Sequence, residues 1–76
     1  MNREAIYQRL MKYDSQALVE VMDLTGTMDH WEVEIESETF RGLTRIQQHK
    51  KIMDCFQQEL ASGEIHALSL RTRVKN

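Results

Sequence analysis

The sequence predicts an α+β fold in which a three-stranded mixed sheet carries helices on one face. Residues 31–36 alternate strictly between apolar and acidic side chains, which is typical of a half-buried strand. An amphipathic segment over residues 43–61 indicates a helix, and a further strand is expected over residues 65–74. A helical crossover of this length allows the two flanking strands to pair in parallel, with a right-handed connection. Helices packed on one face follow from that topology.

The N-terminal third of the chain predicts a helix followed by the first strand of a hairpin. Asn2 is a candidate N-cap for a helix over residues 2–13, and residues 18–24 predict a strand. A loop of about six residues joins this strand to residues 31–36. The apolar positions expected to face the core are Ile6, Tyr7, Leu10 and Met11 of the helix and Trp31, Val33 and Ile35 of the second strand.

The predicted helix over residues 43–61 has candidate caps at both ends, Thr44 at its start and Gly63 after its end. The adjacent Lys50 and Lys51 indicate a break near its middle. Spacings of three and four residues predict one apolar face, made of Ile46, His49, Met53, Phe56 and Leu60.

Charged side chains are expected on the open face of the sheet. Glu32, Glu34 and Glu36 share one parity of the second strand, and Arg71 and Arg73 lie near them on the third. Cross-strand pairing of these charges explains both the acidic set on the second strand and the basic set on the third. Each pair would contribute only some tenths of a kcal/mol.

Length and composition predict a single soluble domain over residues 1–76. The chain is 41% hydrophobic and 29% charged, and its net charge of -2 does not favour indiscriminate binding to nucleic acid or anionic membranes. One cysteine cannot form an internal disulfide, which fits a reducing compartment. The polar N-terminus is unlike a signal peptide, and no apolar run reaches the length of a membrane span. We therefore expect a cytoplasmic protein that does not bind membranes.

The candidates for chemistry are metal-binding side chains. There is no nucleophile elbow, phosphate-binding glycine loop or Cys–His pair in sequence context, so a non-enzymatic role is expected. His49 is interpreted as a packing residue of the apolar helical face, and Cys55 as a small hydrophobic residue. No short metal-binding motif joins the possible ligands, which are His30, His49, Cys55 and His66.

His30 and His66 differ from the other candidates because each stands at the start of a predicted strand. Parallel pairing of those strands would place both imidazoles at the same end of the sheet, where they could share a ligand. The alternative is that each caps a strand edge or bonds a loop carbonyl. Periodicity alone favours this second, structural role.

A basic segment offers a different surface, because no acidic residue occurs between Thr39 and Met53. Basic side chains near a helix N-terminus can bind phosphates or an acidic protein surface. The alternative is that they are simply exposed to solvent. No aromatic residue is interleaved for base stacking, which counts against nucleic acid. The four cations are Arg41, Arg45, Lys50 and Lys51.

Several motifs resemble the BolA-like family, and the resemblance covers the chain from about residue 3 to residue 72. They are Phe40-x-Gly42 with His49-Lys50 seven residues after the glycine, Ile65-His66-Ala67-Leu68-Ser69-Leu70, and His30-Trp31-Glu32-Val33. The resemblance implies an α-β-β-α-α-β order similar to the class II KH fold. It also implies that the long helix is split near residues 48–50.

The resemblance further implies a partner and a cofactor. Members pair with monothiol glutaredoxins and hold a 2Fe–2S cluster between the two proteins, with a glutaredoxin cysteine and glutathione on one side. The matching histidine here is His66. Relatives take a second ligand from the loop between the first two strands, but residues 23–29 contain no cysteine or histidine, so His30 is the candidate. The isolated protein is expected to carry no cofactor and to be a monomer or weak homodimer.

Two roles follow from the resemblance. The first is iron–sulfur trafficking or iron and stress regulation. The alternative is a DNA-binding transcriptional regulator that uses the KH-like fold, with Arg41, Arg45, Lys50 and Lys51 at the phosphates. The KH-type GxxG clamp keeps only its first glycine, Gly42. The chain ends without the Pro and Trp that often close the family's sequences, so it is similar to the shorter, acid-stress type of member.

Overall fold

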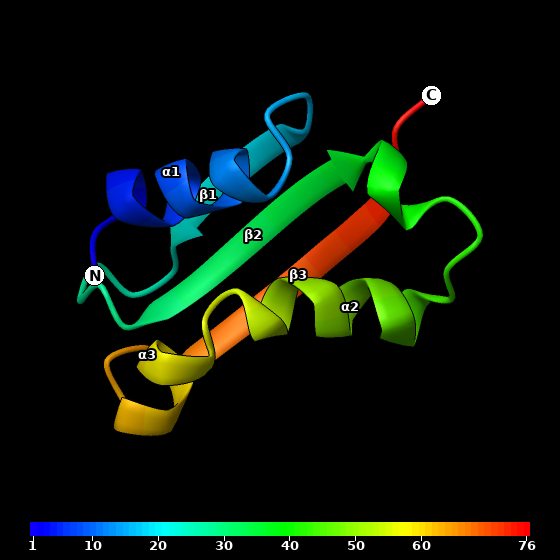
Figure 1. Cartoon of the computed structure of the whole chain (residues 1–76). Coiled ribbons are helices and arrows are strands. Elements are labelled where there is room, and N and C mark those ends of the chain that lie inside the picture. Colours follow the sequence, from blue (N-terminus) through cyan, green and yellow to red (C-terminus); the bar gives the residue numbers. More distant parts are fainter.

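The chain forms its helices and strands in the predicted order, which confirms the α+β class. The computed structural model describes residues 1–76. Its elements are α1 (Arg3–Tyr13), β1 (Leu18–Asp23), β2 (His30–Ser37), the 3₁₀ helix η1 (Glu38–Phe40), α2 (Arg45–Asp54), α3 (Gln57–Ser62) and β3 (Ala67–Val74). Figure 1 shows α1 lying over β1 and α2 lying over β3.

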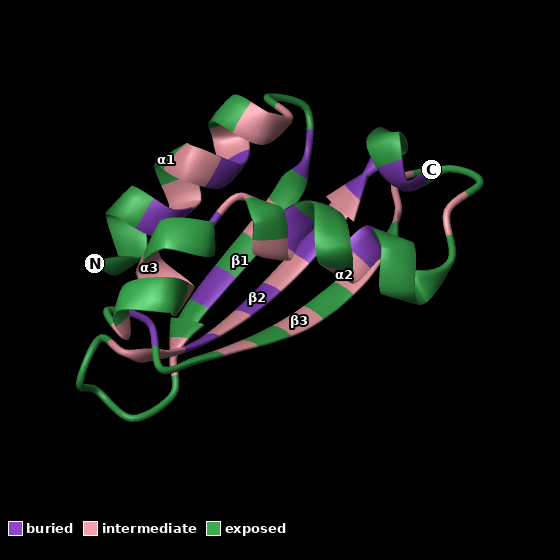
Figure 2. Ribbon diagram, turned by 60° about the horizontal axis from the view of Figure 1, so that its bottom comes forward, coloured by how far each residue is buried: buried purple, intermediate pink, exposed green.

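The sheet is mixed, as predicted, with the strand order β1-β2-β3. β1 and β2 are antiparallel and are joined by the loop of residues 24–29. β2 and β3 are parallel, with His30 opposite Ala67 in the register. All the α-helices lie on one face of the sheet (Figure 2). This arrangement is compatible with the class II KH-like order.

The core lies between the sheet and the helices, and β2 forms its centre. Trp31, Val33 and Ile35 are each at most 1% exposed, so the inward parity predicted from the alternation is confirmed. The rest of the buried apolar cluster is Ile6, Leu10, Ala17, Val21, Phe40, Ile52, Phe56 and Ile65.

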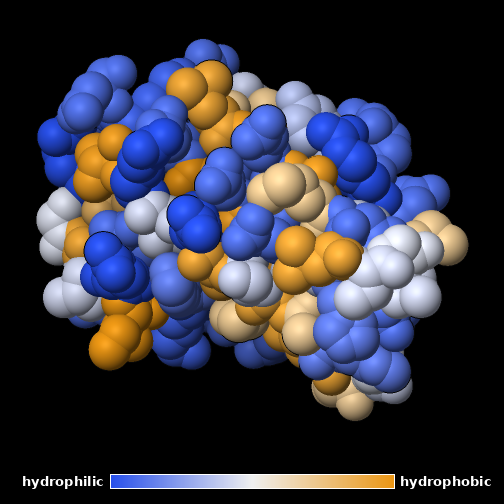
Figure 3. Space-filling model, turned by 180° about the vertical axis from the view of Figure 1, so that it is seen from behind, coloured by the Kyte–Doolittle hydropathy of each residue, from blue (hydrophilic) through white to orange (hydrophobic).

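The opposite face of the sheet is open, and Figure 3 shows hydrophilic side chains there with hydrophobic ones scattered among them. Arg71 Nε lies 3.6 Å from Glu32 Oε1 and 3.9 Å from Glu34 Oε1, and Arg73 pairs with Glu36. The predicted cross-strand pairing is therefore confirmed. Because both arginine side chains are more than two-thirds exposed, each pair contributes no more than about 1 kcal/mol.

The predicted long helix is two helices, and the position of its break was wrong. α2 ends at Asp54 and α3 begins at Gln57, so the chain turns at Cys55 and Phe56 rather than near Lys50. The predicted apolar face was also wrong at its first position, because Ile46 is 82% exposed. None of these helices has the length and apolar character that a membrane crossing requires.

α2 is attached to β3 through a polar side chain. Gln48 is 8% exposed, and its side-chain amide donates to Leu43 O at 3.0 Å. The hydroxyl of Thr72 donates to Gln48 Oε1 at 2.8 Å. Because both ends of the amide are paired, this burial leaves no unsatisfied polar atom, and it fixes which face of α2 meets the sheet.

Three caps predicted from the sequence are confirmed. Ala5 N donates to Asn2 Oδ1 at 2.8 Å, and Thr44 forms a capping box with Gln47. Gly63 ends α3 with φ of 84°, in the left-handed region that disfavours a residue with Cβ. These caps set where the helices begin and where the chain turns toward β3.

The carboxylate of Asp14 fastens the end of β2 to the end of α1. The hydroxyl of Ser37, whose side chain is fully buried, donates to Asp14 Oδ2 at 2.6 Å. Gln16 N donates to Asp14 Oδ1 at 3.0 Å. These two bonds lower the pKa of Asp14 below its usual value of 3.8.

We expect the fold to lose stability in acid as Asp14 becomes protonated. A carboxylate with a lowered folded-state pKa stabilises the fold above its unfolded-state pKa, and this contribution is lost as the pH falls through the folded-state value. The Asp14→Asn variant should therefore be less stable than the wild type at about pH 7, and the difference should shrink below about pH 4. Urea unfolding across this range measures it; a difference that did not change with pH would contradict the assignment.

Candidate metal centre

The fold brings His30 and His66 together at one end of the sheet. Because β2 and β3 are parallel and His30 pairs with Ala67, His66 lies next to His30 although 36 positions separate them in the sequence. Their ring centroids are 5.7 Å apart and the rings are steeply inclined, at 78°. His30 begins β2 as predicted. His66 lies just before β3 rather than within it, because that strand begins at Ala67 and not at Ile65.

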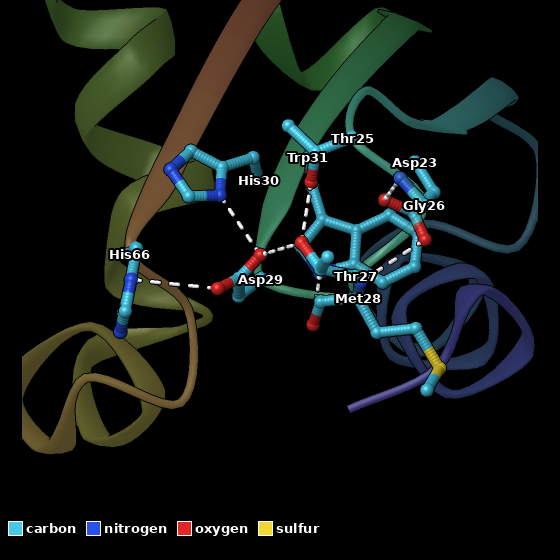
Figure 4. A network of polar contacts seen from close by, with 9 residues as sticks. All are labelled: Asp23, Thr25, Gly26, Thr27, Met28, Asp29, His30, Trp31 and His66. Atoms are coloured by element: carbon cyan, nitrogen blue, oxygen red, sulfur yellow. Dashed lines mark hydrogen bonds and ion pairs between the residues drawn. The ribbon is translucent and has the colours of Figure 1, made fainter.

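The loop before His30 is held by its own side chains. The carboxylate of Asp23 accepts from Gly26 N at 3.0 Å and from Met28 N at 3.1 Å. Gly26 and Met28 both have positive φ, and the indole of Trp31 donates to Met28 O at 3.2 Å. A loop closed by these bonds delivers the next residues to the sheet edge in one orientation (Figure 4).

His66 is held by the chain on both sides of it. Ile65 is 1% exposed and anchors the connection in the core. His66 N donates to Asp29 O at 2.8 Å, and Ala67 N donates to the same carbonyl at 3.2 Å. These bonds join the two loops that carry the histidines.

Asp29 is the residue that sequence reasoning missed. Its Oδ1 lies 2.8 Å from His30 Nδ1, and its Oδ2 lies 3.4 Å from His66 Nδ1 (Figure 4). The hydroxyl of Thr27 donates to Oδ1. The hydrogen bonds from Thr27 and then from His30 lower the pKa of Asp29. The available signal was its position directly before His30, but only the tertiary structure shows that it also meets His66.

The three side chains form a set of metal-binding groups that is open to solvent. One possible ligand atom from each of Asp29, His30 and His66 lies within 4.8 Å of the other two. The side chain of His66 is 59% exposed and that of His30 is 40% exposed, whereas that of Asp29 is 27% exposed. Imidazole nitrogen suits iron, zinc, copper and nickel. The cluster can therefore bind such a metal, with room on the solvent side for ligands from another molecule.

The other two candidate ligands lie outside this site. His49 is half-buried on α2, as expected for a residue at the boundary of the core. Cys55 is half-buried against the core at the end of α2, and burial raises the pKa of its thiol. A raised thiol pKa disfavours the thiolate that binds metals. Cys55 packs partly against the core, as predicted for a small hydrophobic residue.

The four basic residues of the alternative surface do not form one face. Arg41 pairs with Glu38 through two nitrogens, and Lys50 lies 3.6 Å from Asp54. Arg45 and Lys50 are separated by about 140° around the axis of α2. The run of positive charge in the sequence is therefore divided in space, and part of it is paired with acids.

Comparison with known proteins identifies the family. The profile described as BolA-like protein matches residues 9–76. The chain belongs to the BolA-like family. An uncharacterized protein of Rickettsia prowazekii is 29% identical over 72 residues. That match covers 95% of this chain and 92% of the relative.

Solved structures share the fold of this BolA-like protein. BolA1 from Arabidopsis thaliana is 24% identical, with a TM-score of 0.84 over 97% of this chain and 93% of that one. The BolA domain of SufE1 from the same plant is 28% identical, with a TM-score of 0.84 over 97% and 94% of the two chains. The mixed three-stranded sheet with helices on one face is thus the architecture of BolA proteins.

Proposed function

We propose that this BolA-like protein is a non-enzymatic, cytoplasmic partner of a monothiol glutaredoxin, with which it shares a 2Fe–2S cluster. His66 and His30 would be its ligands, and its role would lie in iron–sulfur trafficking or in iron- and stress-dependent regulation. The observation that carries the proposal is the pair of imidazoles at one exposed end of the sheet, with ring centroids 5.7 Å apart.

The available ligands fit a cluster that two molecules hold jointly. A 2Fe–2S cluster takes four protein ligands, and histidine can replace cysteine at two of them. His30 and His66 supply two nitrogen donors, and the chain's single cysteine, Cys55, lies elsewhere. The remaining ligands must then come from another molecule. A glutaredoxin cysteine and glutathione supply thiolates of the required kind.

The chain's own contribution is to hold two nitrogen donors at a surface that a partner can reach. The backbone bonds from His66 and Ala67 to Asp29 O keep His66 beside His30. The 59% exposure of the His66 side chain leaves it accessible from solvent. When bound, the cluster would supply a one-electron centre, and imidazole ligation raises its reduction potential relative to a centre with only thiolate ligands.

Visible circular dichroism of a cluster-loaded monothiol glutaredoxin tests the proposal. We expect the spectrum of the cluster to change saturably as this protein is added in the presence of glutathione, because new ligands alter the asymmetry around the iron. Far-UV circular dichroism of the same samples checks that both proteins stay folded. A cluster spectrum that is unchanged in an excess of folded protein would rule out ligand sharing.

A further inference from the structure

Asp29 places one carboxylate against the same nitrogen of two imidazoles. Its Oδ1 lies at hydrogen-bonding distance from His30 Nδ1, 2.8 Å, and its Oδ2 lies 3.4 Å from His66 Nδ1, a longer electrostatic contact. Figure 4 shows both rings turning their Nδ1 side toward this carboxylate. A single acidic side chain therefore faces both candidate ligands.

The proton positions on the two rings follow from the chemistry of the carboxylate. An ionised carboxylate only accepts hydrogen bonds, so His30 Nδ1, which lies at hydrogen-bonding distance, must carry the proton. At 3.4 Å, attraction to Oδ2 favours a proton on His66 Nδ1 as well. A neutral imidazole has one N–H, so its other nitrogen, Nε2, keeps a free lone pair. Metals bind imidazole through such a lone pair.

We infer that Asp29 is a positioning residue that holds His30 and His66 in the Nδ1–H tautomer and leaves both Nε2 atoms free to bind iron. The role of the Nε2 atoms toward iron rests on the proposed function. The tautomers themselves are a property of the protein alone.

The position of Asp29 fits a role behind the ligands rather than as a ligand. Its side chain is 27% exposed, less than either imidazole. Oδ1 already accepts from Thr27 and faces His30, and Oδ2 faces His66. The backbone carbonyl of Asp29 also accepts from His66 N. Carboxylates that hold metal-binding histidines in this way are a recurring feature of metal sites.

Long-range proton–nitrogen NMR of the isolated protein tests the tautomers without any metal. At a pH where the same spectra show neutral rings, we expect His30 and His66 to carry the proton on Nδ1. His49 serves as an internal reference and should show the Nε2–H form that free histidine prefers. In Asp29→Ala the two site histidines should revert to the Nε2–H form. Nε2–H at His30 in the wild type, or tautomers unchanged in Asp29→Ala, would overturn the assignment.

Cluster sharing with glutaredoxin tests what the positioning achieves. Loss of such an outer partner weakens metal binding about ten- to a hundredfold, so Asp29→Ala should require correspondingly more protein to change the cluster spectrum. Asp29→Asn keeps an accepting oxygen for only one of the two rings, because its other terminal atom is an NH2 donor, so it should lose affinity but less than Asp29→Ala. Equal losses in the two variants would overturn the positioning role. Failure of the wild type to share a cluster contradicts the proposed function instead, while the NMR result still decides the tautomers.

Discussion

Replacing His66 with alanine is expected to abolish the change that the protein produces in the visible circular dichroism of a cluster-loaded glutaredoxin. The substitution removes one of the two nitrogen donors that the chain offers. Losing a ligand should weaken the shared cluster by more than the about ten- to a hundredfold that loss of an outer partner costs. Titration of the cluster-loaded glutaredoxin with wild type and variant, followed by visible circular dichroism, measures the difference.

The fold should survive this substitution, so the result can be assigned to the site. The His66 side chain is 59% exposed, and the bond that fixes its backbone comes from its own N–H, which alanine keeps. We therefore expect a change in unfolding free energy within about 0.5 kcal/mol. Thermal unfolding of the two proteins checks this.

Two further histidine variants make the result specific. His49→Ala is the same chemical change at a half-buried position on α2 outside the site, and it should leave the titration unchanged. His30→Ala should weaken cluster sharing if His30 is the second ligand. A normal titration with His66→Ala would remove His66 from the ligand set. A normal titration with His30→Ala alone would require the second ligand to come from another residue.

The pairing of the two histidines could be predicted because it depends on topology. Strict alternation over residues 31–36 indicated β2, and the length of the helical segment after it allowed a parallel β3. Parallel pairing then puts the starts of both strands at one end of the sheet. The part of the site built by Asp29 could not be predicted in this way, because its contact with His66 depends on loop conformation rather than on periodicity.

The helical segment shows where periodicity fails. The apolar spacing of residues 43–61 predicts a single helical face, and the lysines predict a break near residue 50, but the chain turns at Cys55 and Phe56 without a proline or glycine to mark the turn. Once the helix is divided, Gln48 and Ile52 define the buried face of α2. Ile46 then lies about 200° around the axis from Gln48 and points to solvent. A buried polar residue and an exposed isoleucine cannot be recognised from hydrophobic spacing.

Phe56 is expected to be the most sensitive position in the turn between α2 and α3. Its side chain is fully buried, and the guanidinium of Arg9 lies 5.2 Å from the centre of its ring. Arg9 also donates to Cys55 O at 3.0 Å and pairs with Glu59 at 2.5 Å, so the ring, the turn and α3 are held together. The Phe56→Ala substitution would therefore both leave a cavity and remove the cation–π contact.

We expect Phe56→Ala to lower the free energy of unfolding by about 3–5 kcal/mol, as measured by urea denaturation. Domains of this kind have total stabilities of about 5–15 kcal/mol, so much of the protein could unfold. Ile46→Ala is the matched control, because simple helical spacing puts Ile46 and Phe56 on the same face. With its side chain 82% exposed, Ile46 should tolerate alanine within about 0.5 kcal/mol. Comparable losses of unfolding free energy in the two variants would indicate that one uninterrupted helix covers the sheet. That result would contradict the turn at Cys55 and Phe56.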